Sequence, residues 1–182
     1  LDGAGTPRTT AGGRTAWLFE PSLLEGATGP SDEFVVYSDD GGESWSDPVR
    51  VSDNTPGTAD HDVPSIAVNT YGVVGVAWYD RRHNSGGGCF DIYFSASLDG
   101  GESFLPNVRV TPATSCPQVS GNRVPLAGGD TLDVAARWPA GGYYSGLAAS
   151  TDGSFHVLWA DSRTGVYQLW TARVRVERQP SQ

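Results

Sequence analysis

Two copies of one eight-residue turn decide how this sequence folds. The first copy is Ser38-Asp39-Asp40-Gly41-Gly42-Glu43-Ser44-Trp45, and the second, 59 residues later, is Ser97-Leu98-Asp99-Gly100-Gly101-Glu102-Ser103-Phe104. Both match Ser-x-Asp-x-Gly-x-Ser followed by an aromatic residue. The Asp and Ser side chains of such a segment can hydrogen-bond turn amides, the glycine supplies backbone freedom, and the aromatic ring can anchor the turn. Each copy therefore predicts a structured hairpin turn.

Apolar runs flank both turns, as expected of the two strands of a hairpin. Phe34–Tyr37 precedes the first turn and Pro48–Val51 follows it. Ile92–Phe94 and Val108–Val110 flank the second turn in the same way. Short runs rich in Val, Ile, Tyr and Phe between turn residues are typical of β-strands. The sequence around each turn therefore predicts a strand, a turn and a second strand.

The tryptophans mark a longer repeat that contains the turns. Trp17 and Trp78 lie 61 residues apart, close to the spacing of the turns, and Trp159 follows 81 residues after Trp78. Each lies in an apolar run that predicts a strand, and these runs are Thr15–Phe19, Val73–Tyr79 and Ser154–Asp161. A recurring unit of this size indicates a repeat architecture. We therefore expect one domain with three units, at residues 13–53, 61–112 and 143–177.

The wider second spacing places additional residues between units two and three, in the segment 112–142. This segment contains Ala127-Gly128-Gly129-Asp130 and Trp138-Pro139-Ala140-Gly141-Gly142, which are typical of loops. A long loop inside a compact domain is often functional. The sequence therefore predicts a long loop at 112–142 that bears on function.

The composition favours an all-β protein and excludes some partners. The 182 residues include 24 Gly, 12 Pro, six Trp, seven Tyr and six Phe, which suits short strands joined by tight turns. The formal net charge is −9, and all 12 basic residues are Arg because the sequence contains no Lys. These arginines form no basic run, so the electrostatic footprint that nucleic-acid phosphates require is missing. Nucleic acid and lysine-based chemistry are therefore excluded for this chain.

The hydropathy pattern predicts no membrane span, because no apolar stretch approaches the roughly 18 residues that a spanning helix needs. The sequence also contains no Met. We therefore expect a chain that is processed, trimmed or a piece of something longer.

The two turns resemble the Asp-box repeats of the sialidase (neuraminidase) superfamily, whose four-stranded blades form a six-bladed propeller. Unit three resembles the last blade of bacterial sialidase-like proteins through Trp159–Gly165, and the likeness covers about Thr15 to Val176. It implies an all-β fold with about three four-stranded blades of a six-bladed propeller, incomplete in this chain. The remaining blades are expected from a parent chain, a cleaved partner or a second copy.

The resemblance also implies which rim of the blades holds a ligand. If the Asp box joins strands three and four on one rim, the loop between strands two and three and the link into strand one lie on the opposite rim. Family resemblance places the binding site on that opposite rim. The residues expected there are Glu20, Glu25, His61, Asp62, Asp80, Arg81, Arg82, His83, Tyr143, Tyr144, Asp161 and Arg163.

Sialidase chemistry needs arginines that bind the substrate carboxylate, a carboxylic acid and a tyrosine nucleophile. Arg82 or Arg81 together with Arg163 are the candidate clamps, and Tyr144 or Tyr143 is the candidate nucleophile. The alternative is that the Asp80–Arg82 and Asp161–Arg163 combinations are structural ion pairs, since catalytic groups are normally not repeated around a propeller.

Two functions follow from this pattern. The first is an exo-glycosidase that acts on sialic-acid-type glycans once the propeller is complete. The second is a non-catalytic propeller that binds glycans or proteins, or builds a surface assembly. The Phe/Tyr-Arg-Ile-Pro motif of true sialidases is absent from this sequence, so the isolated chain is expected to be inactive.

The two cysteines and the three histidines give weaker indications of function than the repeat does. Cys89 begins strand three of unit two and Cys116 follows strand four, so a disulfide between them is geometrically reasonable, and two free buried thiols are the alternative. A bridge would favour an extracellular protein, because disulfides persist in oxidising compartments. The histidines show no metal-ligand spacing, and we expect no metal and no other cofactor.

Overall fold

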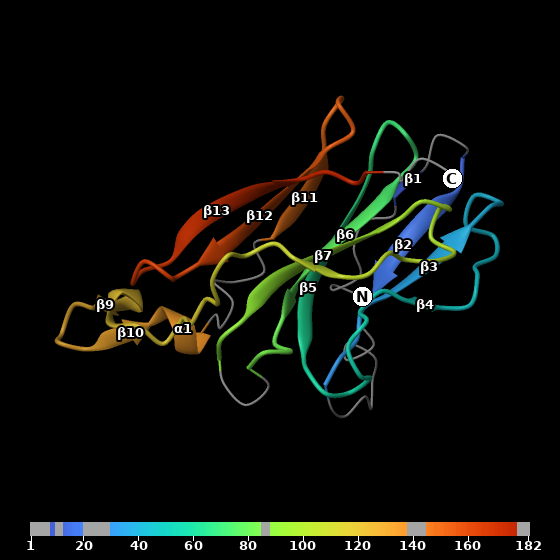
Figure 1. The fold of residues 1–182 in the computed structure, drawn as a ribbon. Helices are drawn as coiled ribbons and strands as arrows, with labels where there is room; N and C mark the ends of the chain where they lie inside the picture. Colours follow the sequence, from blue (N-terminus) through green and yellow to red (C-terminus); the bar gives the residue numbers. More distant parts are fainter. Residues whose placement is uncertain (1–7, 10–12, 20–29, 85–87, 138–144, 178–182) are drawn as a thin grey trace.

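Three antiparallel sheets stand side by side in the computed structural model, as the blades of a propeller do (Figure 1). The structure describes residues 8–9, 13–19, 30–84, 88–137 and 145–177. The sheets are numbered blades 1 to 3 along the chain. In each blade the strands lie in sequence order, so every blade is an up-and-down meander. The all-β class and the incomplete propeller predicted from the sequence are confirmed.

The strand bounds follow the predicted repeats. Blade 1 contains β1 (Arg8–Thr9), β2 (Thr15–Phe19), β3 (Phe34–Ser38) and β4 (Val49–Arg50). Blade 2 contains β5 (His61–Val68), β6 (Val74–Asp80), β7 (Asp91–Ser97) and β8 (Val108–Arg109). Blade 3 contains β11 (Gly146–Ala149), β12 (Phe155–Asp161) and β13 (Gln168–Val174).

Antiparallel pairing sorts the connections onto two rims. The turns 38–45 and 97–104 lie on one rim together with the turns 69–73 and 150–154, and we call it the Asp-box rim. The starts of β5 and β7 and the ends of β6 and β12 lie on the other, which we call the far rim. The assignment of the loops to two rims, made from the sequence, therefore agrees with the strand topology.

Both predicted hairpin turns are present and share one hydrogen-bond pattern. The Ser97 hydroxyl donates to the Asp99 carboxylate at 2.7 Å and accepts the Gly101 amide at 2.7 Å. Ser103 donates its amide to the same carboxylate at 3.0 Å. The equivalent bonds recur in the first turn among Ser38, Asp40, Gly42 and Ser44. These side chains satisfy the turn amides locally, so they stabilise the hairpins.

Blade 2 is buried on both faces, since every residue of β6 and β7 is buried. One face packs on blade 1 in a cluster that includes Ala16, Leu18, Val35, Val76 and Trp78. The opposite face packs on blade 3 in a cluster that includes Tyr79, Phe94, Phe155, Val157 and Trp159. Burial on both faces explains why Val73–Tyr79 is a continuous apolar run rather than an alternating one.

The contact between blades 2 and 3 depends on a glycine. A Cβ atom at Gly75 would lie 2.7 Å from Cε1 of Phe155, which is fully buried. The Phe155 ring also lies 5.4 Å from the Phe94 ring, centroid to centroid. The absent side chain at Gly75 therefore lets the first core residue of β12 pack directly on β6.

A disulfide joins Cys89 to Cys116, which confirms the predicted bridge. Beside it, Phe90 and Ser115 exchange two backbone hydrogen bonds of 2.9 Å, so the bridge extends the pairing of blade 2 beyond β8. The Ser115 hydroxyl then accepts the Ser162 amide of blade 3 at 3.0 Å. The disulfide thus fixes a segment that contacts the end of β12.

The segment predicted as a long loop contains regular structure, which the sequence analysis missed. It holds a 3-10 turn (Ser120–Asn122), β9 (Arg123–Pro125), β10 (Thr131–Asp133) and the short helix α1 (Val134–Arg137). In the connection 126–130 between these strands, Gly128 and Gly129 both have positive φ, 98° and 91°, which glycine adopts without steric cost. The β9–β10 hairpin projects beside blade 3, away from the three sheets (Figure 1). No helix in the described ranges is long and apolar enough to cross a membrane.

The disulfide should contribute substantially to stability. The bridge closes a separation of 27 residues, so the double variant Cys89→Ser/Cys116→Ser is expected to lose about 3 to 4 kcal/mol of unfolding free energy. Urea denaturation followed by circular dichroism measures this loss. A reducing agent should destabilise the parent chain by a similar amount and leave the double variant unchanged. A loss below about 1 kcal/mol would contradict a structural bridge.

Gly75→Ala should weaken the packing of blade 3 on blade 2. The added methyl group meets the Phe155 ring, and overpacking of this kind costs about 1 to 3 kcal/mol. Gly146→Ala is the matched control, because a Cβ atom there lies at an ordinary 3.9 Å from Leu158. Thermal unfolding of both variants decides the point, and equal midpoints would show that the close approach at Gly75 has no energetic consequence.

Candidate functional site

Asp80 and Asp161 are buried carboxylates at the far-rim ends of β6 and β12, the strands that contain Trp78 and Trp159. The Asp80 carboxylate accepts the Trp78 indole N–H at 2.9 Å and the Arg82 backbone amide at 2.8 Å. In blade 3 the Asp161 carboxylate accepts the Trp159 indole N–H at 3.0 Å and the Arg163 amide at 2.8 Å. Each guanidinium also pairs with the carboxylate of its own blade. We call each set a Trp-Asp-Arg clamp, made of Trp78, Asp80 and Arg82 in blade 2 and of Trp159, Asp161 and Arg163 in blade 3.

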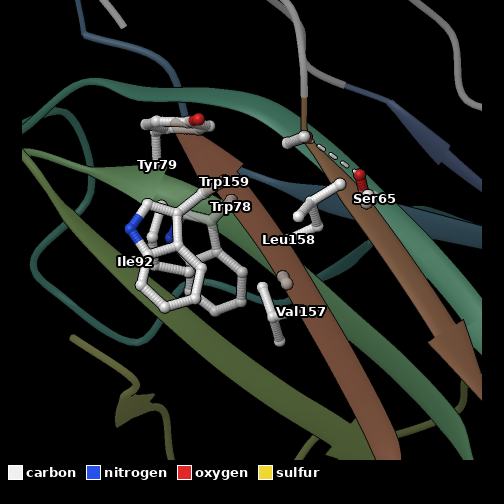
Figure 2. Close-up of a pocket in the computed structure, with 10 residues that line it drawn as sticks. Ser65, Trp78, Tyr79, Ile92, Val157, Leu158 and Trp159 are labelled. Carbon is white, nitrogen blue, oxygen red and sulfur yellow. Dashed lines mark hydrogen bonds between the residues drawn. The ribbon is translucent and has the colours of Figure 1, made fainter. Parts of the chain in front are cut away.

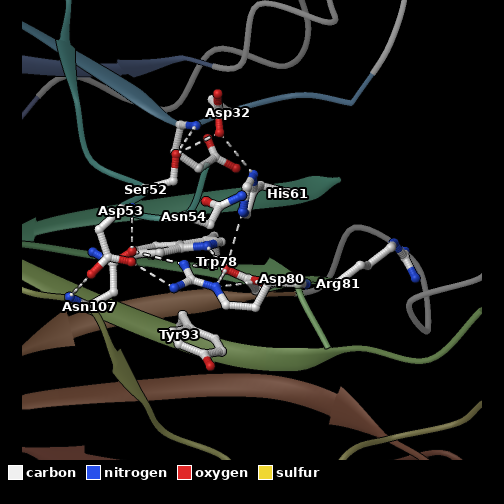
Figure 3. Close-up of polar contacts among 12 residues, drawn as sticks. Asp32, Ser52, Asp53, Asn54, His61, Trp78, Asp80, Arg81, Tyr93 and Asn107 are labelled. Atoms are coloured by element: carbon white, nitrogen blue, oxygen red, sulfur yellow. Dashed lines mark hydrogen bonds and ion pairs between the residues drawn. The ribbon is translucent and has the colours of Figure 1, made fainter. Parts of the chain in front are cut away.

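Arg82 reaches from its clamp to blade 1. Its guanidinium donates to Asp53 at 2.7 Å and to Asn107 at 2.9 Å (Figure 3). The same guanidinium lies over the Tyr93 ring, 4.1 Å from the centroid. In blade 3 the Arg163 guanidinium lies over the Trp170 ring at 4.8 Å. In each clamp the arginine therefore also contacts an aromatic residue on the next strand, the one that lies opposite the clamp tryptophan.

His61 is a fully buried link between blades 1 and 2. Its Nδ1 lies 2.5 Å from the carbonyl oxygen of Ser31 and 3.5 Å from the Asp32 carboxylate. On the other side of the ring, Nε2 lies 3.3 Å from the Asp80 carboxylate. The Ser31 hydroxyl donates back to the His61 carbonyl at 2.7 Å. The sequence analysis placed His61 on the rim as a ligand-facing residue, and the structure places it inside the contact between blades.

A second pair of repeated carboxylates escaped the sequence analysis. Asp32 accepts hydrogen bonds from Arg50 at 2.6 Å and from Ser52 at 2.9 Å. Asp91 accepts from Arg109 at 2.6 Å and from Thr111 at 2.9 Å. All three positions recur at the 59-residue offset of the Asp boxes. That offset, applied to charged residues as well as to the turns, is the signal that would have found them.

The environment of Asp80 favours its charged form. Burial raises the pKa of Asp80, but hydrogen bonds from His61 and Arg82 outweigh this effect and lower the pKa to about 2. For Asp161, burial likewise raises the pKa, and hydrogen bonds from Arg163 and Trp159 lower it below the ordinary value. Both clamps therefore contain a carboxylate rather than a neutral acid at physiological pH.

Asp62 and Arg81 form a different arrangement, next to an irregularity in β5. The register of β5 against β6 shifts between Asp62 and Ser65, and Val63 has a φ of 52°. A positive φ is costly for a β-branched residue. The Arg81 guanidinium pairs with the Asp62 carboxylate at 2.7 Å, and the side chains of Arg81 and Asp62 are 13% and 32% exposed. The bulge therefore presents this ion pair at the far rim.

The other predicted site residues have separate positions. His83 is exposed, and its Nε2 lies 2.7 Å from the Tyr93 hydroxyl. Tyr143 and Tyr144, and Glu20 and Glu25, lie outside the described residues. Within the described ranges, no three His, Cys, Asp or Glu side chains are arranged to hold a metal ion.

One pocket between blades 2 and 3, toward the far rim, is too small for a ligand. Its volume is about 10 Å³, and it is lined by the two clamp tryptophans and by Ser65, which contacts Ser145 at 3.0 Å (Figure 2). A volume of this size holds at most one water molecule. A sugar therefore does not fit in this pocket.

Acid should weaken the blade 2 clamp in a defined pH window. The pKa of Asp80 lies at about 2 in the folded chain and ordinarily at 3.8, so its stabilising effect is complete above about pH 4 and is lost as the pH falls toward 2. Asp80→Asn should cost about 2 kcal/mol at neutral pH and make unfolding less sensitive to pH in this window. Asp130→Asn, in the exposed β9–β10 turn, is the control. Identical pH profiles for the Asp80 variant and the parent chain, from urea melts between pH 7 and 2, would contradict this account.

Comparison by sequence finds no relative, since no protein-family model and no curated protein matches the chain. Comparison of the fold finds many. The Hadza microbial sialidase Hz136 matches with a TM-score of 0.58 at 14% identity, over 95% of this chain and 35% of that one. The GH93 α-L-arabinofuranosidase of Fusarium graminearum matches with 0.56 at 17% identity, over 94% and 44%. A PL25 ulvan lyase matches with 0.51 at 12% identity, over 93% and 40%.

The coverage is as informative as the scores. The chain is matched almost completely, yet it spans only 35% to 44% of the length of these three structures. With identities of 17% or less, the similarities show the fold alone. The chain therefore has the fold of three blades of an incomplete β-propeller.

Proposed function

We propose that the chain is part of a propeller that binds glycans at its far rim and, when further blades complete it, hydrolyses sialic-acid-type glycans. The observation that carries the proposal is the irregular start of β5, where the bulge and Val63 present the Asp62–Arg81 pair. Bulges and strained residues are concentrated near functional sites. Among the described non-glycine residues only Val63 has a positive φ, which supports a functional role for this bulge.

The contacts favour Arg81 over Arg82 as the arginine that meets a substrate carboxylate. Arg81 pairs with one carboxylate, that of Asp62. Arg82 contacts Asp80, Asp53 and Asn107 at once. A ligand therefore displaces fewer contacts at Arg81. In this proposal Arg82 and Arg163 position the rim, and the nucleophile is Tyr144 or Tyr143, as the resemblance to sialidases implies.

The named activities of proteins with this fold support a glycan ligand. The three matched structures are a sialidase, an arabinofuranosidase and an ulvan lyase. All three names refer to carbohydrate cleavage, by different chemistries. The fold is thus used repeatedly on carbohydrates, and the residues of the far rim must decide the reaction.

The second candidate is a non-catalytic propeller that binds glycans or proteins. The observation that favours it is the recurrence of the Trp-Asp-Arg clamp, which engages Arg82 and Arg163 in equivalent contacts. Two arginines held in this way stabilise the rim and need no substrate to satisfy them. In this case the Asp62–Arg81 pair would recognise a ligand without turning it over.

We further propose an extracellular location and completion by more blades. The Cys89–Cys116 bridge supports export, because disulfides persist in oxidising compartments. The open sides of blades 1 and 3 need further blades, since a propeller protects its sheets by radial closure. A parent chain, a cleaved partner or a second copy would supply them.

The complete propeller should release the fluorophore from a fluorogenic sialoside. Arg81→Gln is expected to lower kcat/KM about a hundredfold, because it removes a bidentate contact to the substrate carboxylate. The matched control is Arg14→Gln, which also removes an ion-paired arginine but on the Asp-box rim, where Arg14 pairs with Asp39 and Glu102. The control should stay within about threefold of the parent.

The alternative outcomes separate the two candidates. Equal turnover by the parent protein and Arg81→Gln would overturn the assignment of Arg81. An inactive parent protein that retains ligands on a glycan array, and loses them in Arg81→Gln, would establish the binding function instead.

A further inference from the structure

The Asp-box rim holds a hollow that the proposed function does not use. Its volume is about 620 Å³, within the range of small-molecule sites. It lies between the β5–β6 turn of blade 2 and the β11–β12 turn of blade 3, beside the residues that follow β13. The side chains that matter for the argument are Tyr71, Asp152, Arg175 and Glu177.

Two turns from different blades build this hollow. The Asn69 side chain accepts the amides of Tyr71 at 2.9 Å and Val73 at 3.0 Å, which shapes the β5–β6 turn. The same side chain donates to the Gly153 carbonyl of blade 3 at 2.7 Å. Asn69 is only 6% exposed, so this link is protected from water. The two turns are therefore joined to each other and together form the base of the hollow.

Tyr71 forms an aromatic platform on that floor. A Cβ atom at Gly153 would lie 2.2 Å from Cε2 of Tyr71, so the ring lies directly on the glycine backbone. Nevertheless Tyr71 remains 65% exposed. One side of the ring is supported and most of its remaining surface faces water. Exposed, supported aromatic rings provide large contact area at low entropic cost.

Charged groups of both signs stand beside the platform. Asp152 accepts the Ser154 hydroxyl and pairs with Arg173, so hydrogen bonds from Ser154 and the nearby arginines lower its pKa to about 2. Arg175 lies 3.8 Å from the same carboxylate, and its side chain is 64% exposed. The exposed Glu177 also lines the hollow. The lining thus offers donors and acceptors, and Arg173 and Arg175 balance the charges of Asp152 and Glu177, so the hollow carries little net charge.

We propose that this hollow binds a neutral pyranose sugar. A pyranose has a face of C–H groups, which suits the Tyr71 ring, and an edge of hydroxyl groups, which suits Arg175 as donor and Glu177 as acceptor. The site lies on the rim opposite the one proposed for sialic-acid-type glycans. It would give the protein a second, independent contact to a carbohydrate.

Saturation-transfer NMR on the full chain tests the site with the methyl pyranosides of glucose, galactose, mannose and xylose. At least one of them should receive saturation mainly at the ring C–H protons. Tyr71→Ala should weaken its binding about tenfold, and Tyr71→Phe should keep it within about threefold because stacking remains. Leu169→Ala is the control, since Leu169 is 69% exposed on β13 and does not line the hollow.

Several results would overturn the proposal. They are no transfer to any of the four pyranosides, transfer that Tyr71→Ala leaves unchanged, and equal losses in Tyr71→Ala and Leu169→Ala. Transfer only to methyl glucuronide, run in parallel, would also overturn it, because the proposed ligand is a neutral sugar. Circular dichroism confirms that each variant is folded. Since the far-rim proposal is tested with a sialoside and Arg81→Gln, the two can fail separately.

Discussion

The buried carboxylate at the ends of β6 and β12 is the interaction on which the far rim of blades 2 and 3 depends. A blade that packs on both faces must end its central strand without leaving a charge unpaired in the interior. Asp80 and Asp161 meet this requirement with an indole N–H, a backbone amide and a guanidinium each. The arginine then covers the aromatic residue of the next strand. Each Trp-Asp-Arg clamp therefore ends its strand, covers an aromatic residue of the core and holds the first residues of the next loop.

The same carboxylates join the blades to one another. Asp80 contacts His61, which reaches Ser31 and Asp32 of blade 1. In blade 3, the segment held by the Cys89–Cys116 bridge positions Ser162 beside the second clamp. Such buried polar networks are costly when only partly satisfied, so each blade constrains the polar contacts of its neighbour. The rim is therefore rigid where the repeat is kept, and function is to be sought where the repeat is broken.

Sequence reasoning predicted some of these features and missed others. The two hairpin turns, the tryptophan strands and the disulfide were predictable because each depends on local turn chemistry, on apolar runs or on the proximity of adjacent strands. The β9–β10 hairpin was missed because its strands are three residues each and only Gly128 and Gly129 mark it. The bulge at Asp62–Ser65 was missed because register shifts leave no pattern in a single sequence. His61 was placed on the rim but is buried, since its partners come from another blade.

Double-mutant cycles on the two clamps test this account most directly. Asp80→Asn and Arg82→Gln, alone and together, give the coupling energy in blade 2, and Asp161→Asn with Arg163→Gln gives it in blade 3. If both clamps stabilise the rim as equivalent structural units, each cycle should show a coupling of about 1 to 3 kcal/mol in urea unfolding. A coupling near zero in either blade would contradict the account, because that arginine would then be free to serve a ligand rather than the fold.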